Sequence, residues 1–297
     1  MKKFISLVLF LLITASMANF QVYAKQNSKV AKVTDSQTIR GTWLWNTKSI
    51  INEGEDIIRF LKDNKYNELY LQVNTDIKKE VYNKFIENAS KNGIGVYALD
   101  GNPIWIFKDK RQSLNKFFDW VKKYNESSLQ NQKFIGIHLD VEPYVLPEWS
   151  TKRDILVGNY QDYILYSLTE VNKLNLPFAV DVPFWFDVVN CGKENLAEWV
   201  ISKVDEINIM AYRDKAYGEG NIIDICKSEM ELSKRYNKKL KISVEIGDTK
   251  EGDFITFYQE GTKYMISELD KVNSYYKSLG YNFGFAVHSL DYLRAKK

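Results

Sequence analysis

The chain reads FIGIHLDVEPY over residues 134–144, an apolar run that ends in two carboxylates separated by one residue. Side chains alternate between the two faces of a β-strand, so Asp140 and Glu142 point the same way, as does His138 before them. In a strand of a parallel barrel, this shared face lines the interior, and the carboxyl end of the strand lies where barrel active sites lie. Two carboxylates beside apolar and aromatic residues can have their pKa values pushed apart, so that one acts as an acid. A structural aspartate and a solvated glutamate would give the same pattern, so the other strands must decide.

Short β-branched and aromatic runs alternate with longer amphipathic segments along the chain. The predicted strands are residues 41–46, 68–74, 95–100, 134–142, 177–183, 206–212, 241–246 and 283–288. Helical patterns lie near residues 50–63, 76–92, 110–125, 152–174, 193–202, 221–237 and 260–279, with a short one after Ser289. Such alternation indicates parallel strands joined by right-handed crossovers. Eight units in about 255 residues, without a GxGxxG motif after the first strand, predict an α/β fold: a single-domain (β/α)8 TIM barrel.

The N-terminus has the pattern of a secretory signal peptide. Met1-Lys2-Lys3 precedes a mostly apolar run that is short for a membrane span of about 20 residues, and Val22-Tyr23-Ala24 offers a cleavage site. We therefore expect a signal peptide at 1–24, a flexible leader at 25–39 and the catalytic barrel at 40–297. The mature protein is expected to be secreted or attached to the cell surface, without stable membrane insertion.

Composition narrows the possible partners. The net charge is only +3, and acidic and basic residues are mixed throughout, so no nucleic-acid partner is expected. Cys191 and Cys226 are the only cysteines. They can pair in an exported protein or be two buried small hydrophobes, and without a CxxC motif neither is expected to be catalytic.

The ends of the predicted strands carry acidic and aromatic side chains. In chain order they are Trp43, Trp45, Asn74, Asp100, Asp140, Glu142, Tyr144, Asp181, Trp185, Asp187, Met210, Tyr212, Glu245 and His288. Aromatic rings stack on the apolar faces of sugars and carboxylates bind hydroxyl groups, so carbohydrate is the expected ligand. Several of these residues, Trp43 and Met210 above all, could equally fill the core.

At three of these strands the chain resembles glycoside hydrolase family 18, the chitinase-like (β/α)8 enzymes. The family's strand-four pattern D-G-x-D-x-D-x-E corresponds to residues 135–142, where Asp140 and Glu142 keep the last two acidic positions. Its strand-six pattern D-x-I-N-x-M-A-Y-D corresponds to DEINIMAYR at 205–213, and its strand-eight run to a Trp followed by Ser-x-Asp corresponds to GFAVHSLD at 284–291.

The resemblance implies a role for each matching residue. Glu142 matches the general acid/base that protonates the glycosidic oxygen. Asp140 matches the carboxylate that orients the substrate's 2-acetamido group, whose carbonyl oxygen is the nucleophile in that family. Tyr212 matches the hydroxyl that steadies this oxygen. The implied activity is hydrolysis of glycans that contain N-acetylhexosamine, with no protein nucleophile, a known exception to the two-carboxylate scheme.

Two histidines depart from the family pattern. His138 stands in place of an Asp that helps to set the charge of Asp140 in the family, and His288 stands in place of the Trp under the reacting sugar. An imidazole at 138 could donate a hydrogen bond or carry positive charge at mildly acidic pH, which would keep Asp140 ionised instead of sharing a proton. Both could also be hydrogen-bonded core residues, and no HxH or HExxH spacing supports a metal site.

Two alternatives remain open from the sequence. Glu142 and Glu245 lie on strands four and seven, the strands that carry the acid/base and the nucleophile in another clan of retaining glycosidases. A non-catalytic glycan-binding barrel is the second alternative, because His138 and His288 replace family residues. We expect a monomer that needs no cofactor and no metal. The predicted catalytic residues are Glu142, Asp140 and Tyr212, and the predicted substrate-binding residues are Trp45, Asp100, His138, Tyr144, Trp185, Asp187, Met210, Glu245 and His288.

Overall fold

The computed structural model describes residues 39–295. The predicted signal peptide and the leader up to residue 38 lie outside the described residues. In the part that is described, no helix has both the length and the apolar character needed to cross a membrane.

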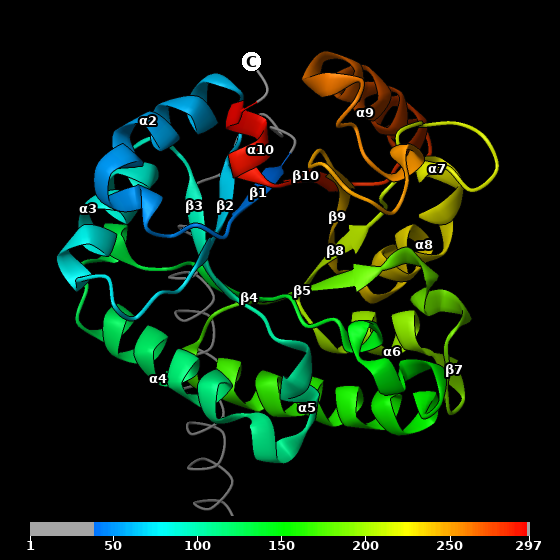
Figure 1. Ribbon diagram of the computed structural model, residues 1–297, viewed down its shortest axis with the longest axis horizontal. Helices are drawn as coiled ribbons and strands as arrows, with labels where there is room; N and C mark the ends of the chain where they lie inside the picture. The colour runs from blue at the N-terminus through cyan, green and yellow to red at the C-terminus, as the bar shows by residue number, and fades with distance from the viewer. Residues whose placement is uncertain (1–38, 296–297) are drawn as a thin grey trace, which may run out of the picture. The chain divides into compact units, whose positions relative to one another are not determined.

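Within residues 39–295, eight parallel strands close into a barrel, in the order β1-β10-β9-β8-β5-β4-β3-β2 (Figure 1). They are β1 (Arg40–Leu44), β2 (Glu68–Gln72), β3 (Gly95–Asp100), β4 (Gly136–Leu139), β5 (Phe178–Pro183), β8 (Glu206–Met210), β9 (Lys239–Glu245) and β10 (Gly284–His288). The predicted (β/α)8 barrel is confirmed, and each predicted strand is present, with bounds within a few residues of the predicted ones.

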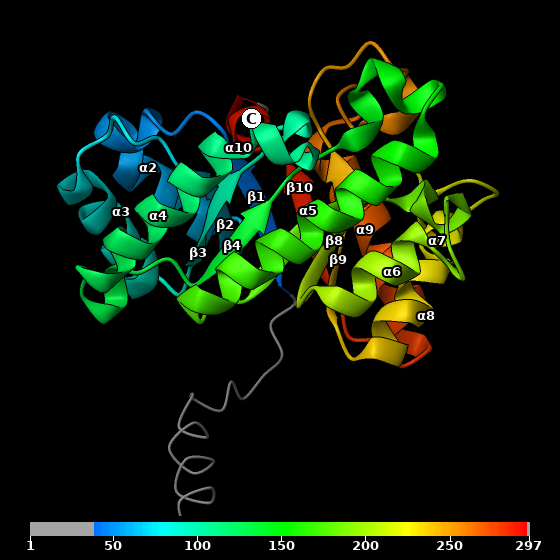
Figure 2. The ribbon, with the colours of Figure 1, turned by 90° about the horizontal axis from the view of Figure 1, so that it is seen from below.

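Helices surround the strands, as Figures 1 and 2 show from two directions. They are α2 (Ser49–Asp63), α3 (Lys79–Lys91), α4 (Gln112–Glu126), α5 (Arg153–Leu174), α6 (Leu196–Lys203), α7 (Ile222–Ile225), α8 (Lys227–Tyr236), α9 (Gly261–Ser278) and α10 (Leu290–Ala295). Their apolar stripes pack on the outward side chains of the strands, most of which are Val, Ile or Leu. This layer between helices and barrel is the main hydrophobic core.

Two features were missed by the sequence analysis. The chain after β5 forms a small antiparallel pair, β6 (Asn190–Cys191) with β7 (Glu194–Asn195). The predicted helix at 221–237 is two helices, α7 and α8, that meet at Cys226. The thiols of Cys191 and Cys226 are both free, which settles the alternative that the sequence left open.

The barrel interior is filled by aromatic rings that need small residues opposite them. Trp43 packs edge-on against Tyr70, with ring centroids 4.8 Å apart, and Tyr70 packs in the same way against Tyr97 at 5.8 Å. A Cβ atom at Gly41 would lie 2.3 Å from the Tyr70 hydroxyl, and one at Gly136 would lie 2.3 Å from the Tyr97 ring. Glycine at these two positions therefore makes room for the two tyrosines.

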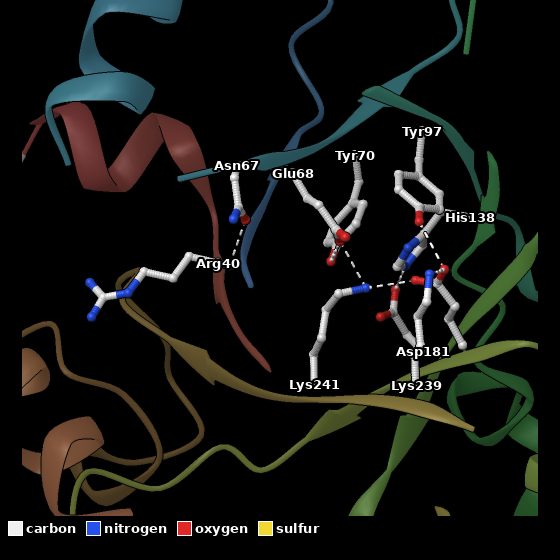
Figure 3. Close-up of polar contacts among 10 residues, drawn as sticks. Arg40, Asn67, Glu68, Tyr70, Tyr97, His138, Asp181, Lys239 and Lys241 are labelled. Carbon is white, nitrogen blue, oxygen red and sulfur yellow. Dashed lines mark hydrogen bonds and ion pairs between the residues drawn. The ribbon is translucent and has the colours of Figure 1, made fainter. Parts of the chain in front are cut away.

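An ion cluster closes the amino-terminal end of the barrel (Figure 3). The Lys241 ammonium, on β9, lies 2.8 Å from Glu68 Oε2 and 2.9 Å from Glu206 Oε2, and its side chain is 1% exposed. Glu206 also accepts hydrogen bonds from Lys239 and from the Tyr97 hydroxyl, both at 2.9 Å. Burial by itself would raise the pKa of Glu206, but the two lysines outweigh it and hold this pKa at about 2. The cluster is structural, because it lies at the end of the barrel opposite the loops that follow the strands.

Candidate active site

The carboxyl ends of the strands bring the predicted catalytic residues to one end of the barrel. Asp140 and Glu142 directly follow β4, Tyr212 follows β8, and all three side chains are half-buried. Tyr212 interacts electrostatically with both Asp140 and Glu142. The three predicted catalytic residues therefore share one site, although β4 and β8 are not neighbours in the barrel.

The two carboxyl groups that follow β4 both have pKa values above their usual range. Burial raises the pKa of Asp140 well above its usual range, and the charges of Asp181 and Glu142 add to this effect. Burial also raises the pKa of Glu142; the Tyr144 hydroxyl, by hydrogen bonding to it, opposes the rise. A carboxyl group that keeps its proton near neutral pH can act as a general acid.

His138 lies fully buried inside the barrel, beneath the half-buried residues. Its Nε2 atom lies 2.7 Å from Asp181 Oδ2 on β5, and the same oxygen accepts a hydrogen bond from Trp43 Nε1 at 3.2 Å. The imidazole ring lies over the Tyr70 ring, with centroids 4.2 Å apart. His138, which was predicted to bind substrate, therefore contacts Asp181, an interior carboxylate to which the sequence analysis gave no role.

His288 connects two other predicted residues, Trp45 and Glu245. The Trp45 indole N–H donates to His288 Nε2 at 3.1 Å, and His288 Nδ1 lies 2.7 Å from Glu245 Oε2. Because an indole N–H can only donate, Nε2 must accept, which places the imidazole proton on Nδ1, pointing at Glu245. Burial lowers the pKa of His288, but the hydrogen bond and charge of Glu245 outweigh this effect and raise it overall.

Glu245 itself is held by the backbone as well. Its Oε1 atom accepts hydrogen bonds from the amides of Ile246 at 2.9 Å and Gly247 at 2.5 Å. A side chain at Gly247 would come within 2.8 Å of this oxygen, so glycine allows the close approach. Both carboxylate oxygens of Glu245 are therefore engaged.

Aromatic residues form one side of the site. The Tyr144 ring meets the Trp185 ring edge-on at 5.0 Å, and Trp185 in turn contacts Trp149 at 6.1 Å. Tyr144 and Trp185 were predicted to bind substrate, and both keep partly exposed rings that a sugar can contact. Trp149, which lies in the loop after β4, was not predicted.

The remaining predicted residues lie at the edge of the site or below it. Met210 is buried at the end of β8. Asp100 accepts a hydrogen bond from the Gly101 amide, and burial raises its pKa to about 6. Asp187 is half-buried in the short helix η6 (Phe184–Val188), and its charge helps to raise the pKa of Glu229 on α8, outside the barrel.

Asp181 is a candidate functional residue that was predicted neither as catalytic nor as substrate-binding. It was visible as an acidic residue in an otherwise apolar predicted strand, but its partners Trp43 and His138 lie 138 and 43 residues away. The site thus holds carboxyl groups at Asp140, Glu142, Asp181 and Glu245. Among residues 39–295, no group of three or more His, Cys, Asp or Glu side chains is arranged to hold a metal ion.

Solved structures that resemble the chain over most of its length include two chitinases. One is a chitinase from Bacteroides thetaiotaomicron, with a TM-score of 0.55 and 12% sequence identity, over 86% of this chain and 91% of that one. The other is a family 18 chitinase from the chitin utilization locus of Flavobacterium johnsoniae, with a TM-score of 0.53 and 16% identity, over 87% of this chain and 89% of that one. The chain has the fold of these chitinases. No protein-family model and no curated protein sequence matches it. The resemblance to family 18 therefore holds for the fold, and the function has to be argued from the site.

Proposed function

We propose that this chain is an exported glycoside hydrolase that cleaves glycans containing N-acetylhexosamine, with Glu142 as the general acid and base. The observation that carries the proposal is the state of Glu142: a half-buried carboxyl at the end of β4 whose burial raises its pKa. A protonated carboxyl at this place can give its proton to a glycosidic oxygen and take one from water afterwards. Export is proposed from the N-terminal sequence alone.

The proposed reaction uses the substrate's own acetamido oxygen as the nucleophile. Asp140, two residues before Glu142, orients the acetamido group, and the Tyr212 hydroxyl steadies its oxygen. Burial raises the pKa of Tyr212 well above its usual range, and the charges of Glu245, Asp181 and Asp140 add to this effect. The hydroxyl therefore keeps its proton and can donate a hydrogen bond that positions the acetamido oxygen for attack on the anomeric carbon.

The aromatic side of the site supports a carbohydrate substrate. Tyr144, Trp185 and Trp45 all have partly exposed rings. His288, which accepts from Trp45 and donates to Glu245, is a polar group where family 18 has a Trp. The sugar subsite in this chain is therefore proposed to be more polar than in the family.

A covalent route through Glu245 is the less supported alternative. The two carboxylate oxygens of Glu245 accept hydrogen bonds from Ile246, Gly247 and His288, and these bonds lower its nucleophilicity. Glu245 is therefore better suited to orient His288 than to attack the sugar. A retaining mechanism with Glu142 as acid/base and Glu245 as nucleophile predicts cleavage of sugars without an acetamido group.

The test is turnover of chromogenic N-acetylglucosaminides and the matching glucosides by the wild-type protein and by Glu142→Gln. We expect cleavage of the acetamido sugars alone and its loss in Glu142→Gln. Glu148→Gln is the matched control, because Glu148 is an exposed residue of the same loop, and it should keep full activity. Equal cleavage of glucosides would favour Glu245 as the nucleophile. Unchanged turnover in Glu142→Gln, or glycan binding measured by calorimetry without any product, would reject the proposed hydrolase.

A further inference from the structure

Strands β4 and β5 bring two aspartates side by side inside the barrel. Their register pairs His138 with Ala179 and Leu139 with Val180. The ladder ends there, and the next residues on the two chains are Asp140 and Asp181, whose carboxyl groups lie close enough for their charges to interact. Strand alternation directs both side chains to the interior, where Asp181 is 3% exposed.

The two carboxyl groups have unequal hydrogen bonding. Asp181 Oδ2 accepts a hydrogen bond from Trp43 Nε1 and lies 2.7 Å from His138 Nε2, so this oxygen has two nitrogen partners. Oδ1 of Asp181 and Oδ1 of Asp140 are both buried and have no hydrogen-bond partner among the described residues. Two close, buried carboxyl groups resist both being ionised, so the one without donors keeps the proton.

We propose that Asp181 is a positioning residue of the site, whose carboxylate, held ionised by Trp43 and His138, keeps a proton on Asp140 by like-charge repulsion. Asp181 on β5 thus supplies the second carboxylate of the pair with Asp140, and the imidazole of His138 on β4 holds Asp181 in place. This explains why a histidine at 138 is compatible with a working carboxyl pair.

The surroundings of Asp140 agree with this assignment. The titratable side chains that interact with it are Asp181, Glu142, Tyr144, Tyr160, Tyr163 and Tyr212. Burial raises the pKa of each of these tyrosines, so they stay neutral. Burial is the largest cause of the raised pKa of Asp140, and the charge of Asp181 comes next, ahead of Glu142.

A neutral Asp140 presents one O–H donor and one carbonyl acceptor to a ligand. In the proposed reaction it can hydrogen-bond the acetamido group without placing a negative charge beside Glu142. This consequence rests on the proposed function, whereas the protonation state of Asp140 does not.

The experiment is a pH titration of the protein labelled with 13C at the aspartate carboxyl carbons, followed by NMR. Comparison with Asp140→Asn assigns the Asp140 signal. We expect Asp140 to titrate above its usual range in the wild type, and its pKa to fall by about 1–3 units in Asp181→Asn. Glu142→Gln is the matched control, since it also removes a neighbouring carboxylate, and it should lower the pKa of Asp140 by less.

A second variant covers the case in which Asp181→Asn fails to fold. Trp43→Phe keeps the Asp181 carboxylate but removes one of its donors, so the proton moves toward Asp181 and the pKa of Asp140 again falls. An unchanged Asp140 titration in the folded variants, or a larger fall in Glu142→Gln than in Asp181→Asn, would overturn the inference. Because no turnover is measured, the result does not depend on whether the protein hydrolyses the glycosides above.

Discussion

The Trp45 indole donates its N–H to Nε2 of His288, across 3.1 Å and 243 residues of sequence. This hydrogen bond uses the lone pair of Nε2, to which a second proton would have to bind, while Nδ1 is hydrogen-bonded to Glu245. The Trp45 hydrogen bond therefore opposes protonation of His288, whereas the charge of Glu245 favours it. The balance between these two neighbours sets the charge at this position of the site.

Trp45→Phe should raise the pKa of His288. Phenylalanine keeps the ring but removes the donor, so protonation at Nε2 no longer breaks a hydrogen bond. A net hydrogen bond of about 0.5–1.5 kcal/mol corresponds to a rise of up to about 1 pKa unit. The measurement is an NMR titration of the imidazole signals, which is simple because the chain has two histidines.

Trp185→Phe is the control for this titration. The Trp185 ring packs on Tyr144 and Trp149, so its loss should leave the His288 signal unchanged. A pKa for His288 that stays the same or falls in Trp45→Phe would contradict the assigned direction of the hydrogen bond.

Lys241→Met should destabilise the protein by about 3–5 kcal/mol. The substitution keeps much of the side-chain volume but leaves the buried Glu68 and Glu206 carboxylates without their shared cation, which now lies 2.8 and 2.9 Å from them. The free energy of unfolding, measured by urea denaturation, gives the cost. Lys239→Met is the matched control: the Lys239 side chain is 63% exposed, and its loss should cost about 1 kcal/mol or less. Equal costs for the two variants would show that the cluster does not depend on burial.

The strands of this barrel were predictable because their signal is local. Short apolar runs and their spacing gave all eight, and β3 has the predicted bounds, Gly95–Asp100. Strand β4 is shorter than predicted, because its ladder with β5 ends at Leu139 and a turn begins at Pro143. Alternation within that one run was enough to place Asp140 and Glu142 together.

The cross-strand partners were not predictable in the same way. The pairs Trp45 with His288 and His138 with Asp181 depend on the stagger between strands, which no local pattern encodes. Lys241 shows the same limit. A lysine at the edge of a predicted strand looks like a surface residue, and its burial depends on Glu68 and Glu206, which come from other strands.

Tyr144→Phe should move the pH dependence of hydrolysis upward. Burial raises the pKa of Glu142, and the hydrogen bond from the Tyr144 hydroxyl limits that rise by stabilising the carboxylate. Without the hydroxyl, Glu142 should keep its proton to a higher pH, and the alkaline limb of kcat/KM should shift by about 0.5–1 unit. Tyr217→Phe is the control, because Tyr217 is exposed in the loop after β8, and its profile should match the wild type. A downward shift of the limb in Tyr144→Phe would assign the proton donor to another residue.

Glu229→Gln should stabilise the protein more at pH 9 than at pH 5. Glu229 is fully buried on α8, neither of its carboxylate oxygens has a partner among the described residues, and burial raises its pKa from 4.5 to about 8. Between these two values the folded protein holds a proton that the unfolded chain has released, so stability falls as the pH rises through this window. Below the window the group is neutral in both states and has no effect on stability.

The full pKa shift corresponds to at most about 5 kcal/mol. Because the glutamine variant does not titrate, its stability advantage over the wild type should grow from pH 4.5 to 8 and then level off. Urea unfolding of both proteins at several pH values measures this difference. Glu231→Gln, a change at an exposed position of the same helix, should show no such trend; a constant difference for Glu229→Gln across the window would mean that Glu229 is charged in the folded state.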